Sequence, residues 1–227
     1  MTTIQGRLTD IRQRIAFAAI RSGRSPQAVT LIAVSKRVPV ARLQEVADLG
    51  QILFGENYLQ EAADKIAALP GLGWHFIGGI QSNKIRQIAE LFQVVETVDR
   101  LKIASTLENH LASLGKTISV YAQVNIGREA QKSGVLPEHV DLLVAGIQKC
   151  PHLRLAGLMA MPPYQPDPEA SRPFFSQMKE LVDDLLHRGV VSSPLGLSMG
   201  MSADFEIAIE EGATLVRVGS ALFGDRE

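Results

Sequence analysis

The sequence predicts an α/β protein built as a single (β/α)8 barrel of the TIM type, with an extra helix at the N-terminus. Short apolar runs typical of buried strands alternate with amphipathic helical segments from one end of the chain to the other. These runs number eight, and strands joined by helical crossovers must pair in parallel with both faces covered. No linker or change in composition divides residues 1–227, so we expect one domain. An open, doubly wound sheet is the alternative arrangement.

The helices are delimited by residues that favour helix starts and stops. An apolar stripe from Ile4 to Ile15 predicts the N-terminal helix, which ends near Gly23. Pro39 and Gly50 bound the helix that follows the first strand. The remaining signals are Ser82 before 83–92, Asp99 before 101–114 with Gly115 after it, Pro137, Pro173 with Gly189, and Ser202 as the cap of a helix that Gly212 ends.

The strands are predicted from the apolar runs between those helices. They span residues 29–35, 51–54, 74–77, 93–98, 118–125, 153–160, 194–198 and 214–218. In a closed parallel barrel all carboxyl ends of the strands open at the same face, and the loops there carry the functional residues. We therefore expect a binding site among the polar, glycine-rich residues that follow these strands.

The composition excludes several classes of function. The 23 Lys and Arg residues are balanced by 24 Asp and Glu residues, so there is no basic surface typical of binding to nucleic acid or to an anionic membrane. No apolar stretch is long enough to span a bilayer or resembles a signal peptide, so we expect a cytoplasmic protein. Cys150 is the sole cysteine, which excludes an internal disulfide and a cysteine-rich metal site, and we expect no metal.

Lys36 is the first candidate site residue, because it ends the apolar run 29–35 where a strand leaves the barrel. A solvated lysine, with a pKa of about 10.4, is almost fully protonated at neutral pH and is a poor nucleophile. Partial desolvation or a nearby cation lowers such a pKa, and the neutral amine forms a Schiff base with an aldehyde. From this position alone, a lysine in water at a strand end is the simpler interpretation. Residues near the C-terminus favour the reactive one.

The loops after the seventh and eighth strands have the features of a phosphate site. Ser202 contributes a hydroxyl at a predicted helix start. Gly219 and Ser220 begin the last short helix without a bulky side chain that would block an anion. Each feature alone is more simply a helix cap or a tight turn. Their position on adjacent loops of a barrel favours phosphate binding.

Arg217 is unusual because it lies inside the apolar strand 214–218, on the same face as Gly219. It points either into the barrel mouth or outward to a carboxylate such as Glu210 or Glu211. A lysine able to condense with an aldehyde, a phosphate cradle and an inward cation together match the aldehyde, phosphate and ring nitrogen of pyridoxal phosphate.

Several motifs follow one another along almost the whole chain. They are AVSK (33–36), FGENY (54–58), WHFIG (74–78), QSNK (81–84), GLM (157–159), SMGMSAD (198–204) and VRVGSALFG (216–224). In this order they resemble the pyridoxal phosphate homeostasis proteins, also called the YggS or proline synthetase co-transcribed family. The resemblance implies a barrel of the alanine racemase type, which is fold type III among proteins that bind pyridoxal 5'-phosphate (PLP).

The resemblance also implies a set of cofactor-binding residues. Lys36 would hold PLP as an internal aldimine, and Arg217 would face the pyridine nitrogen. The further residues are Ser202, Gly219 and Ser220, with Ser198, at the phosphate, and Asn57, His75 and Met161 beside the ring. The chain departs from the family's usual residues at Gly79, Ile80 and Ser220, but none of these changes removes a functional group of the site.

Arg217 has a chemical consequence for the function. A guanidinium does not give up its proton, so a pyridine that faces it stays unprotonated and stabilises a carbanion poorly. The resemblance implies a carrier or regulator in PLP (vitamin B6) and amino-acid homeostasis, without substantial catalysis. It also implies a monomer that binds PLP and has PLP-dependent apo-enzymes as candidate recipients.

Two enzymatic alternatives remain open from the sequence. One is a PLP-dependent amino-acid racemase. Racemases with this barrel take a catalytic tyrosine from a second, β-rich domain, whereas Tyr58, Tyr121 and Tyr164 all lie within the predicted barrel. Tyr164 could enter the site from the loop after the sixth strand. The other alternative is a Schiff-base aldolase for sugar phosphates, which would use Lys36 and the phosphate loops without PLP.

Overall fold

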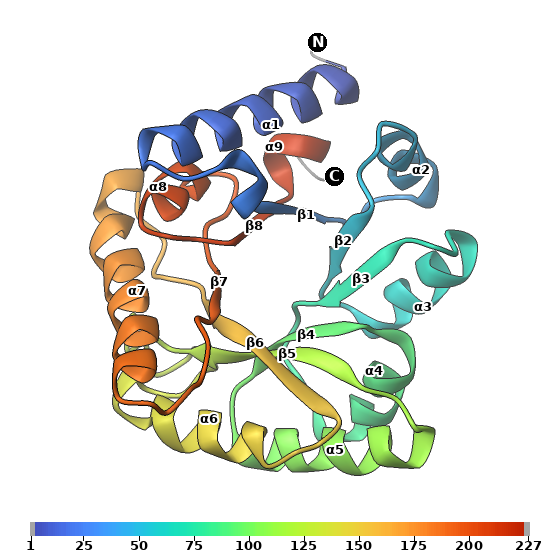
Figure 1. The fold of residues 1–227 in the computed structure, drawn as a ribbon. Coiled ribbons are helices and arrows are strands. Elements are labelled where there is room, and N and C mark those ends of the chain that lie inside the picture. The colour runs from blue at the N-terminus through green and yellow to red at the C-terminus, as the bar shows by residue number, and fades with distance from the viewer. Residues whose placement is uncertain (1–2, 225–227) are drawn as a thin grey trace.

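The structure, a computed structural model, describes residues 3–224 and contains a closed parallel barrel with strand order β1 to β8. The predicted barrel is therefore confirmed, and the open sheet is excluded. The helices surround the strands as an outer layer (Figure 1). The strands are β1 Thr30–Val34, β2 Leu53–Glu56, β3 Gly73–Phe76, β4 Val94–Val98, β5 Ile118–Val124, β6 Leu153–Ala160, β7 Gly196–Ser198 and β8 Leu215–Val218.

The α-helices follow the predicted alternation. They are α1 Ile4–Arg21, α2 Val40–Asp48, α3 Leu59–Ala68, α4 Ile85–Leu91, α5 Leu101–Leu114, α6 Val140–Gln148, α7 Arg172–His187, α8 Phe205–Glu210 and α9 Ser220–Phe223. Gly115 ends α5 in the left-handed region at φ 60°, where glycine has no Cβ to clash. Single 3-10 turns precede α4, α6 and α7, so α4 begins at Ile85, after the turn Ser82–Lys84, and not at residue 83.

The second strand begins two residues later than predicted. The side chain of Gln51 donates hydrogen bonds of 2.8 Å to the carbonyls of Leu31 and Leu53, which holds this residue before the strand. Ile52 is 61% exposed although it is apolar. Strand β2 therefore covers 53–56 instead of 51–54, and Glu56 lies within it.

Ser202 does not cap a helix, which corrects the prediction. Helix α8 begins at Phe205, and the carboxylate Oδ1 of Asp204 accepts a hydrogen bond of 2.7 Å from the N–H of Met201 in the preceding turn. Asp204 is the N-cap residue of α8, and its side chain makes no hydrogen bond to the helix. The Ser202 hydroxyl bonds at the barrel mouth instead.

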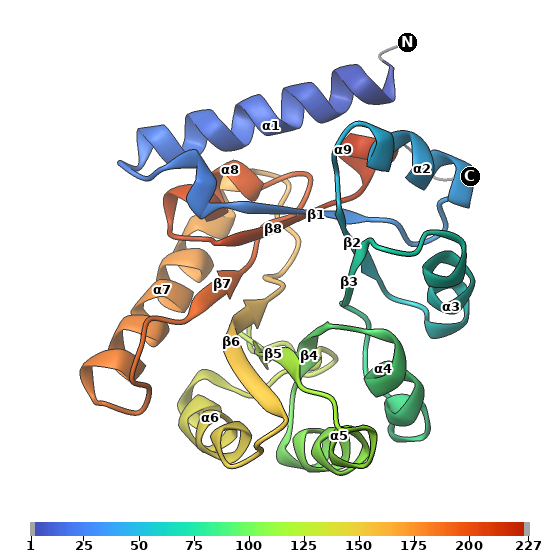
Figure 2. The same cartoon turned by 45° about the vertical axis from the view of Figure 1, so that its right-hand side comes forward.

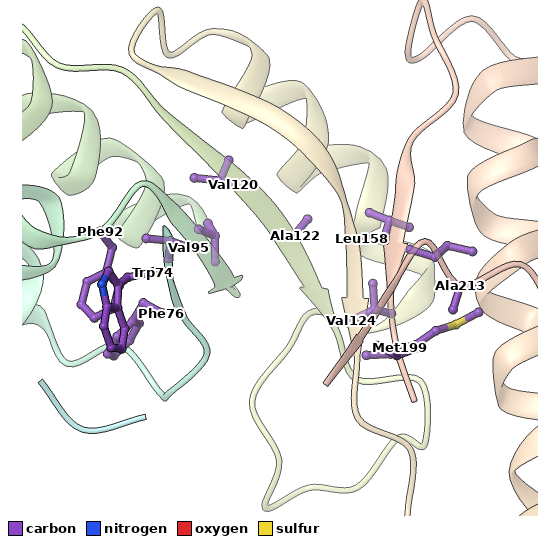
Figure 3. Packing of buried hydrophobic residues seen from close by; sticks show 14 of the residues in the cluster. Trp74, Phe76, Phe92, Val95, Val120, Ala122, Val124, Leu158, Met199 and Ala213 are labelled. Atoms are coloured by element: carbon purple, nitrogen blue, oxygen red, sulfur yellow. The ribbon is translucent and has the colours of Figure 1, made fainter. Parts of the chain in front are cut away.

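Apolar side chains between the strands and the outer helices form most of the core. Figure 3 shows Trp74, Phe76 and Phe92 gathered beside β3 and β4. The ring of Phe92 meets that of Phe76 edge to face, with 5.2 Å between the centroids. A second, smaller cluster of Ile32, Tyr121, Met159 and Leu215 fills the inside of the barrel. Packing on both faces fixes the strands that carry the mouth residues.

Helix α1 crosses the outside of the barrel and packs against α8 and α9 (Figure 2). Arg14 pairs with both carboxylate oxygens of Glu206, at 2.7 and 2.9 Å, and the side chain of Arg24 donates to the carbonyl of Ile209 at 2.8 Å. These contacts tie the N-terminal segment to helix α8, which lies between β7 and β8. Among residues 3–224, no helix combines the length and the apolar content that a bilayer crossing requires.

Candidate functional site at the barrel mouth

A cavity of about 290 Å³ opens at the carboxyl ends of the strands. Seven of the nine predicted site residues line it, namely Lys36, Asn57, Met161, Ser202, Arg217, Gly219 and Ser220. Val34, Ile77, Met201 and Ala203 complete the wall and were not singled out from the sequence. Residues from β1, β8, α9 and the loops after β1, β2, β3, β6, β7 and β8 therefore converge on one space. His75 and Ser198 do not line this cavity and lie below it.

Lys36 stands in the turn that follows β1, beside the last strand of the barrel. Ile32 of β1 pairs with Arg217 of β8, so the first and last strands carry the two candidate cations to the same side of the mouth. The N–H of Ser35 donates to the carbonyl of Gly55 at 3.0 Å and continues the ladder to the residue before Lys36. Lys36 itself is half-buried.

Arg217 points inward, which settles the two orientations that the sequence left open. Its side chain is 3% exposed, and its guanidinium donates to the hydroxyl of Ser198 and, at 2.9 Å, to the carbonyl of Ala160. The outward partners are taken by other arginines, since Arg172 pairs with both Glu210 and Glu211. A guanidinium held by two fixed acceptors has a fixed orientation beneath the cavity.

Glu96 balances this buried cation. Its carboxylate is fully buried and lies 3.8 Å from Arg217, and it accepts hydrogen bonds from Ser198 Oγ at 2.6 Å and from His75 Nδ1 at 2.6 Å. Burial alone would raise the pKa of Glu96, but the hydrogen bond from His75 and the charges of His75 and Arg217 hold it below its ordinary value. Burial lowers the pKa of Arg217, and the Glu96 charge opposes that shift.

His75 and Ser198 are therefore parts of the support for Arg217 rather than cavity walls. Glu96 was not predicted as a site residue, although it lies inside an apolar strand in the same way as Arg217. A carboxylate inside the apolar run Val94–Val98 predicts a buried partner for a charge. The partner comes from a strand more than a hundred residues away, which the run alone does not identify.

Ser202 joins the two loops that were predicted to bind phosphate. Its Oγ accepts hydrogen bonds of 3.2 Å from the N–H groups of Gly219 and Ala221. With its oxygen accepting from two amides, the hydroxyl keeps its own hydrogen as a donor. The loops after β7 and β8 therefore form one surface at the cavity, made of a hydroxyl and the backbone around Gly219.

Asn57 lines the same cavity and carries a buried polar atom. Its Oδ1 atom is buried and has no hydrogen-bond partner among residues 3–224. The backbone of Asn57 is fixed closely against β3, because a Cβ on Gly78 would come within 2.2 Å of the Asn57 carbonyl oxygen. A buried amide without a partner is costly, and such a group in a cavity wall is typical of a ligand site.

A second cavity of about 440 Å³ adjoins the first and shares Asn57, Ile77, Met161 and Met201 with it. It is bordered by Lys132 and Tyr164 from the loops after β5 and β6. Lys132 is paired with Glu129 and donates to the carbonyl of Pro162 at 3.0 Å. Tyr164 is 84% exposed and lies at the rim. The mouth therefore has room for a second molecule beside the cavity that Lys36 lines.

Comparison with known proteins agrees with this geometry. Residues 8–227 match the family model described as the alanine racemase N-terminal domain. The chain is 47% identical over its full length to the pyridoxal phosphate homeostasis protein of Pseudomonas aeruginosa, covering 97% of that protein. The chain belongs to the pyridoxal phosphate homeostasis protein family. The member of this family from Escherichia coli (strain K12) is 43% identical over the full chain and is covered to 98%.

Solved structures place the family member within a wider fold group. PipY of Synechococcus elongatus PCC7942, solved with PLP bound, superposes with a TM-score of 0.83 at 32% identity, covering 98% of this chain and all of PipY. Alanine racemase of Clostridium difficile superposes with a TM-score of 0.69 at 16% identity, and the match covers 94% of this chain and 56% of the racemase. At that identity the second comparison shows a shared fold only.

Proposed function

We propose that the protein binds pyridoxal 5'-phosphate in the mouth cavity, attached covalently to Lys36, and acts as a carrier or regulator in PLP and amino-acid homeostasis. The observation that carries this proposal is the convergence of Lys36, Arg217 and the Ser202–Ser220 loops on one cavity of about 290 Å³. The homeostasis role of relatives with 43% to 47% identity over the full chain supports it, as does the PLP bound to PipY.

The residues present fit this cofactor. When bound, PLP supplies an aldehyde, a phosphate and a ring nitrogen. The aldehyde joins a lysine amine with loss of one water. Lys36 offers the amine. Ser202 with Gly219 and Ser220 offers a hydroxyl donor and a surface without large side chains, and Arg217 offers a fixed donor. Asn57 lines the same cavity, and its buried Oδ1 has no hydrogen-bond partner among residues 3–224.

Arg217 favours holding the cofactor over using it as a strong electron sink. The Glu96 carboxylate beside it favours the charged guanidinium, which donates hydrogen bonds and does not give up its proton. A ring nitrogen that faced this group would stay unprotonated. His75 and Ser198 keep Glu96 in place and therefore act on the cofactor only through Arg217.

Borohydride reduction followed by peptide mass analysis tests the attachment. Purified protein incubated with PLP and reduced should carry one pyridoxyl group on the peptide that contains Lys36, and Lys36→Ala should lose it. Lys84→Ala serves as a control because Lys84 lies outside the mouth cavity. An adduct found mainly on Lys84 or Lys132 would contradict the assignment, and protein that does not react with PLP would return the aldolase alternative.

A PLP-dependent racemase is the second candidate, and Tyr164 is the observation that favours it. This side chain borders the adjoining cavity, which is large enough for an amino acid beside the cofactor. Exchange of the α-proton of alanine and other amino acids in deuterated water separates the two functions. Turnover comparable to ordinary racemases, lost in Tyr164→Phe, would overturn the carrier proposal. Absence of exchange at high protein concentration would support it.

The proposal extends to location, assembly and recipients. The protein acts in the cytoplasm as a monomer and passes PLP to PLP-dependent apo-enzymes. Light scattering on purified protein measures the mass directly, and a dimer would contradict the assembly. Restoration of activity to an apo-enzyme by the loaded protein, faster than by released PLP alone, is the result expected for transfer.

A further inference from the structure

A buried cluster behind the mouth holds the backbone on both sides of Lys36. Lys65 on α3 is 3% exposed, and its Nζ donates a hydrogen bond of 2.6 Å to the carbonyl of Ser35, which belongs to the peptide group before Lys36. Glu61 on the same helix accepts one of 2.5 Å from the N–H of Arg37, which belongs to the peptide group after Lys36. The two peptide groups that flank Lys36 are thus bound to a single helix.

Two ion pairs of Lys65 complete the cluster. Lys65 Nζ lies 2.5 Å from Glu61 Oε1 and 2.7 Å from Glu56 Oε1, and Ser35 Oγ donates to the same oxygen of Glu56 at 2.6 Å. Glu56 is fully buried, and its second carboxylate oxygen has no partner among residues 3–224. Burial raises the pKa of Glu56, while the hydrogen bonds from Lys65 and Ser35 oppose that shift. One lysine therefore satisfies a carbonyl and two carboxylates at once.

The turn held in this way is strained. Arg37 has φ 59°, in the left-handed region that residues other than glycine rarely occupy. The residue is exposed, and its guanidinium lies over the Tyr58 ring at 5.9 Å from the centroid, so its side chain is not packed in the core. The hydrogen bond from its N–H to Glu61 is the contact that fixes the peptide group. The backbone dihedrals of Lys36 lie between these two fixed peptides.

We propose that Lys65, together with Glu61 and Glu56, is a positioning group that aims the amine of Lys36 at the cofactor aldehyde. The proposal rests on the proposed function, in which Lys36 is the attachment point. None of the three side chains lines either mouth cavity, whereas Lys65 and Glu61 bind the two peptide groups that flank Lys36. A reacting atom displaced by about 1 Å can slow its reaction by about 100-fold. A Glu and a Lys four residues apart on a helix ordinarily form an exposed pair, which is why the sequence did not single them out.

The rate of attachment tests the proposal on the full-length protein. We would follow the absorbance change when PLP joins Lys36, in stopped-flow mixing, for Lys65→Met, Glu61→Met and Glu61→Gln. Lys65→Met and Glu61→Met should each slow attachment about 10- to 100-fold. Glu61→Gln keeps an acceptor oxygen for the Arg37 N–H. On a logarithmic scale of attachment rates, it should therefore recover at least half of the decrease seen in Glu61→Met. Since Glu61 is partly exposed, its variants should fold even where Lys65→Met does not.

Lys116→Met is the matched control. Lys116 also donates to three backbone carbonyls, those of Ala89, Glu90 and Phe92, but at the outer end of α4. It should lose stability without a change in the attachment rate. If the wild type forms no adduct, the proposed function fails. If the wild type reacts and both methionine variants react as fast as Lys116→Met, or if Glu61→Gln is as slow as Glu61→Met, the positioning role is wrong.

Discussion

Glu96→Gln is the sharpest test of the charge balance beneath the mouth. The change keeps the shape and the hydrogen-bonding capacity of the side chain but removes the carboxylate that faces Arg217. Two unit charges 3.8 Å apart attract by about 4 kcal/mol at an effective dielectric constant of ~20. Loss of one partner from a buried pair costs about 3–5 kcal/mol, because the remaining charge stays buried. We expect the free energy of unfolding to fall by about 3 kcal/mol or more.

Urea unfolding followed by tryptophan fluorescence measures this loss. Trp74 is the only tryptophan and is 1% exposed in the core, so its emission reports on the barrel as a whole. A loss of about 3 kcal/mol corresponds to a midpoint about 1–2 M lower in urea.

The matched control is Glu108→Gln. Glu108 also binds a histidine, with its Oε1 2.7 Å from His152 Nδ1, but the pair is partly exposed. The control should cost less than about 1 kcal/mol. If Glu96→Gln costs no more than Glu108→Gln, the buried charges do not stabilise the barrel as reasoned.

Three further results are expected. The folded state holds the pKa of Glu96 below its ordinary value. The stabilisation that Glu96 contributes is therefore present above pH ~4.5 and is lost as the pH falls through the lowered pKa. The difference in unfolding free energy between wild type and Glu96→Gln should shrink between pH 6 and pH 3 in the urea assay. Gly78→Ala should lower stability by about 1–3 kcal/mol and weaken PLP binding in titrations, because the new Cβ would clash with the Asn57 carbonyl. Unchanged affinity for PLP would contradict the role of that contact. Phe92→Ala should cost about 3–5 kcal/mol in the same unfolding assay without moving the adduct from Lys36, because the ring is fully buried but lies away from the mouth.

The fold could be predicted because a closed barrel repeats one strand and one helix eight times. The periodicity of the apolar residues and the residues that start and stop helices both indicate this repeat. The first and last residues of the strands were harder to predict from the sequence. Ile52 is apolar yet exposed, because the hydrogen bonds of Gln51 and not hydropathy determine where β2 begins. Ser202 was placed at the mouth correctly but given a helix-capping bond that it does not make, since its partners lie in the loop after β8. Lys65 was missed because nothing local distinguishes a buried lysine from an exposed one.

Pairing between the first and last strands determines when the site can exist. Thr30 pairs with Leu215, so this ladder forms only after the chain has been synthesised through β8. A nascent chain carries Lys36 early but lacks Arg217 and Gly219 until β8 and the loop after it have been synthesised. Contacts of such long sequence separation form late in folding. The mouth cavity therefore exists only in a ring-closed molecule, and a shorter nascent chain carries Lys36 without Arg217 and Gly219 beside it.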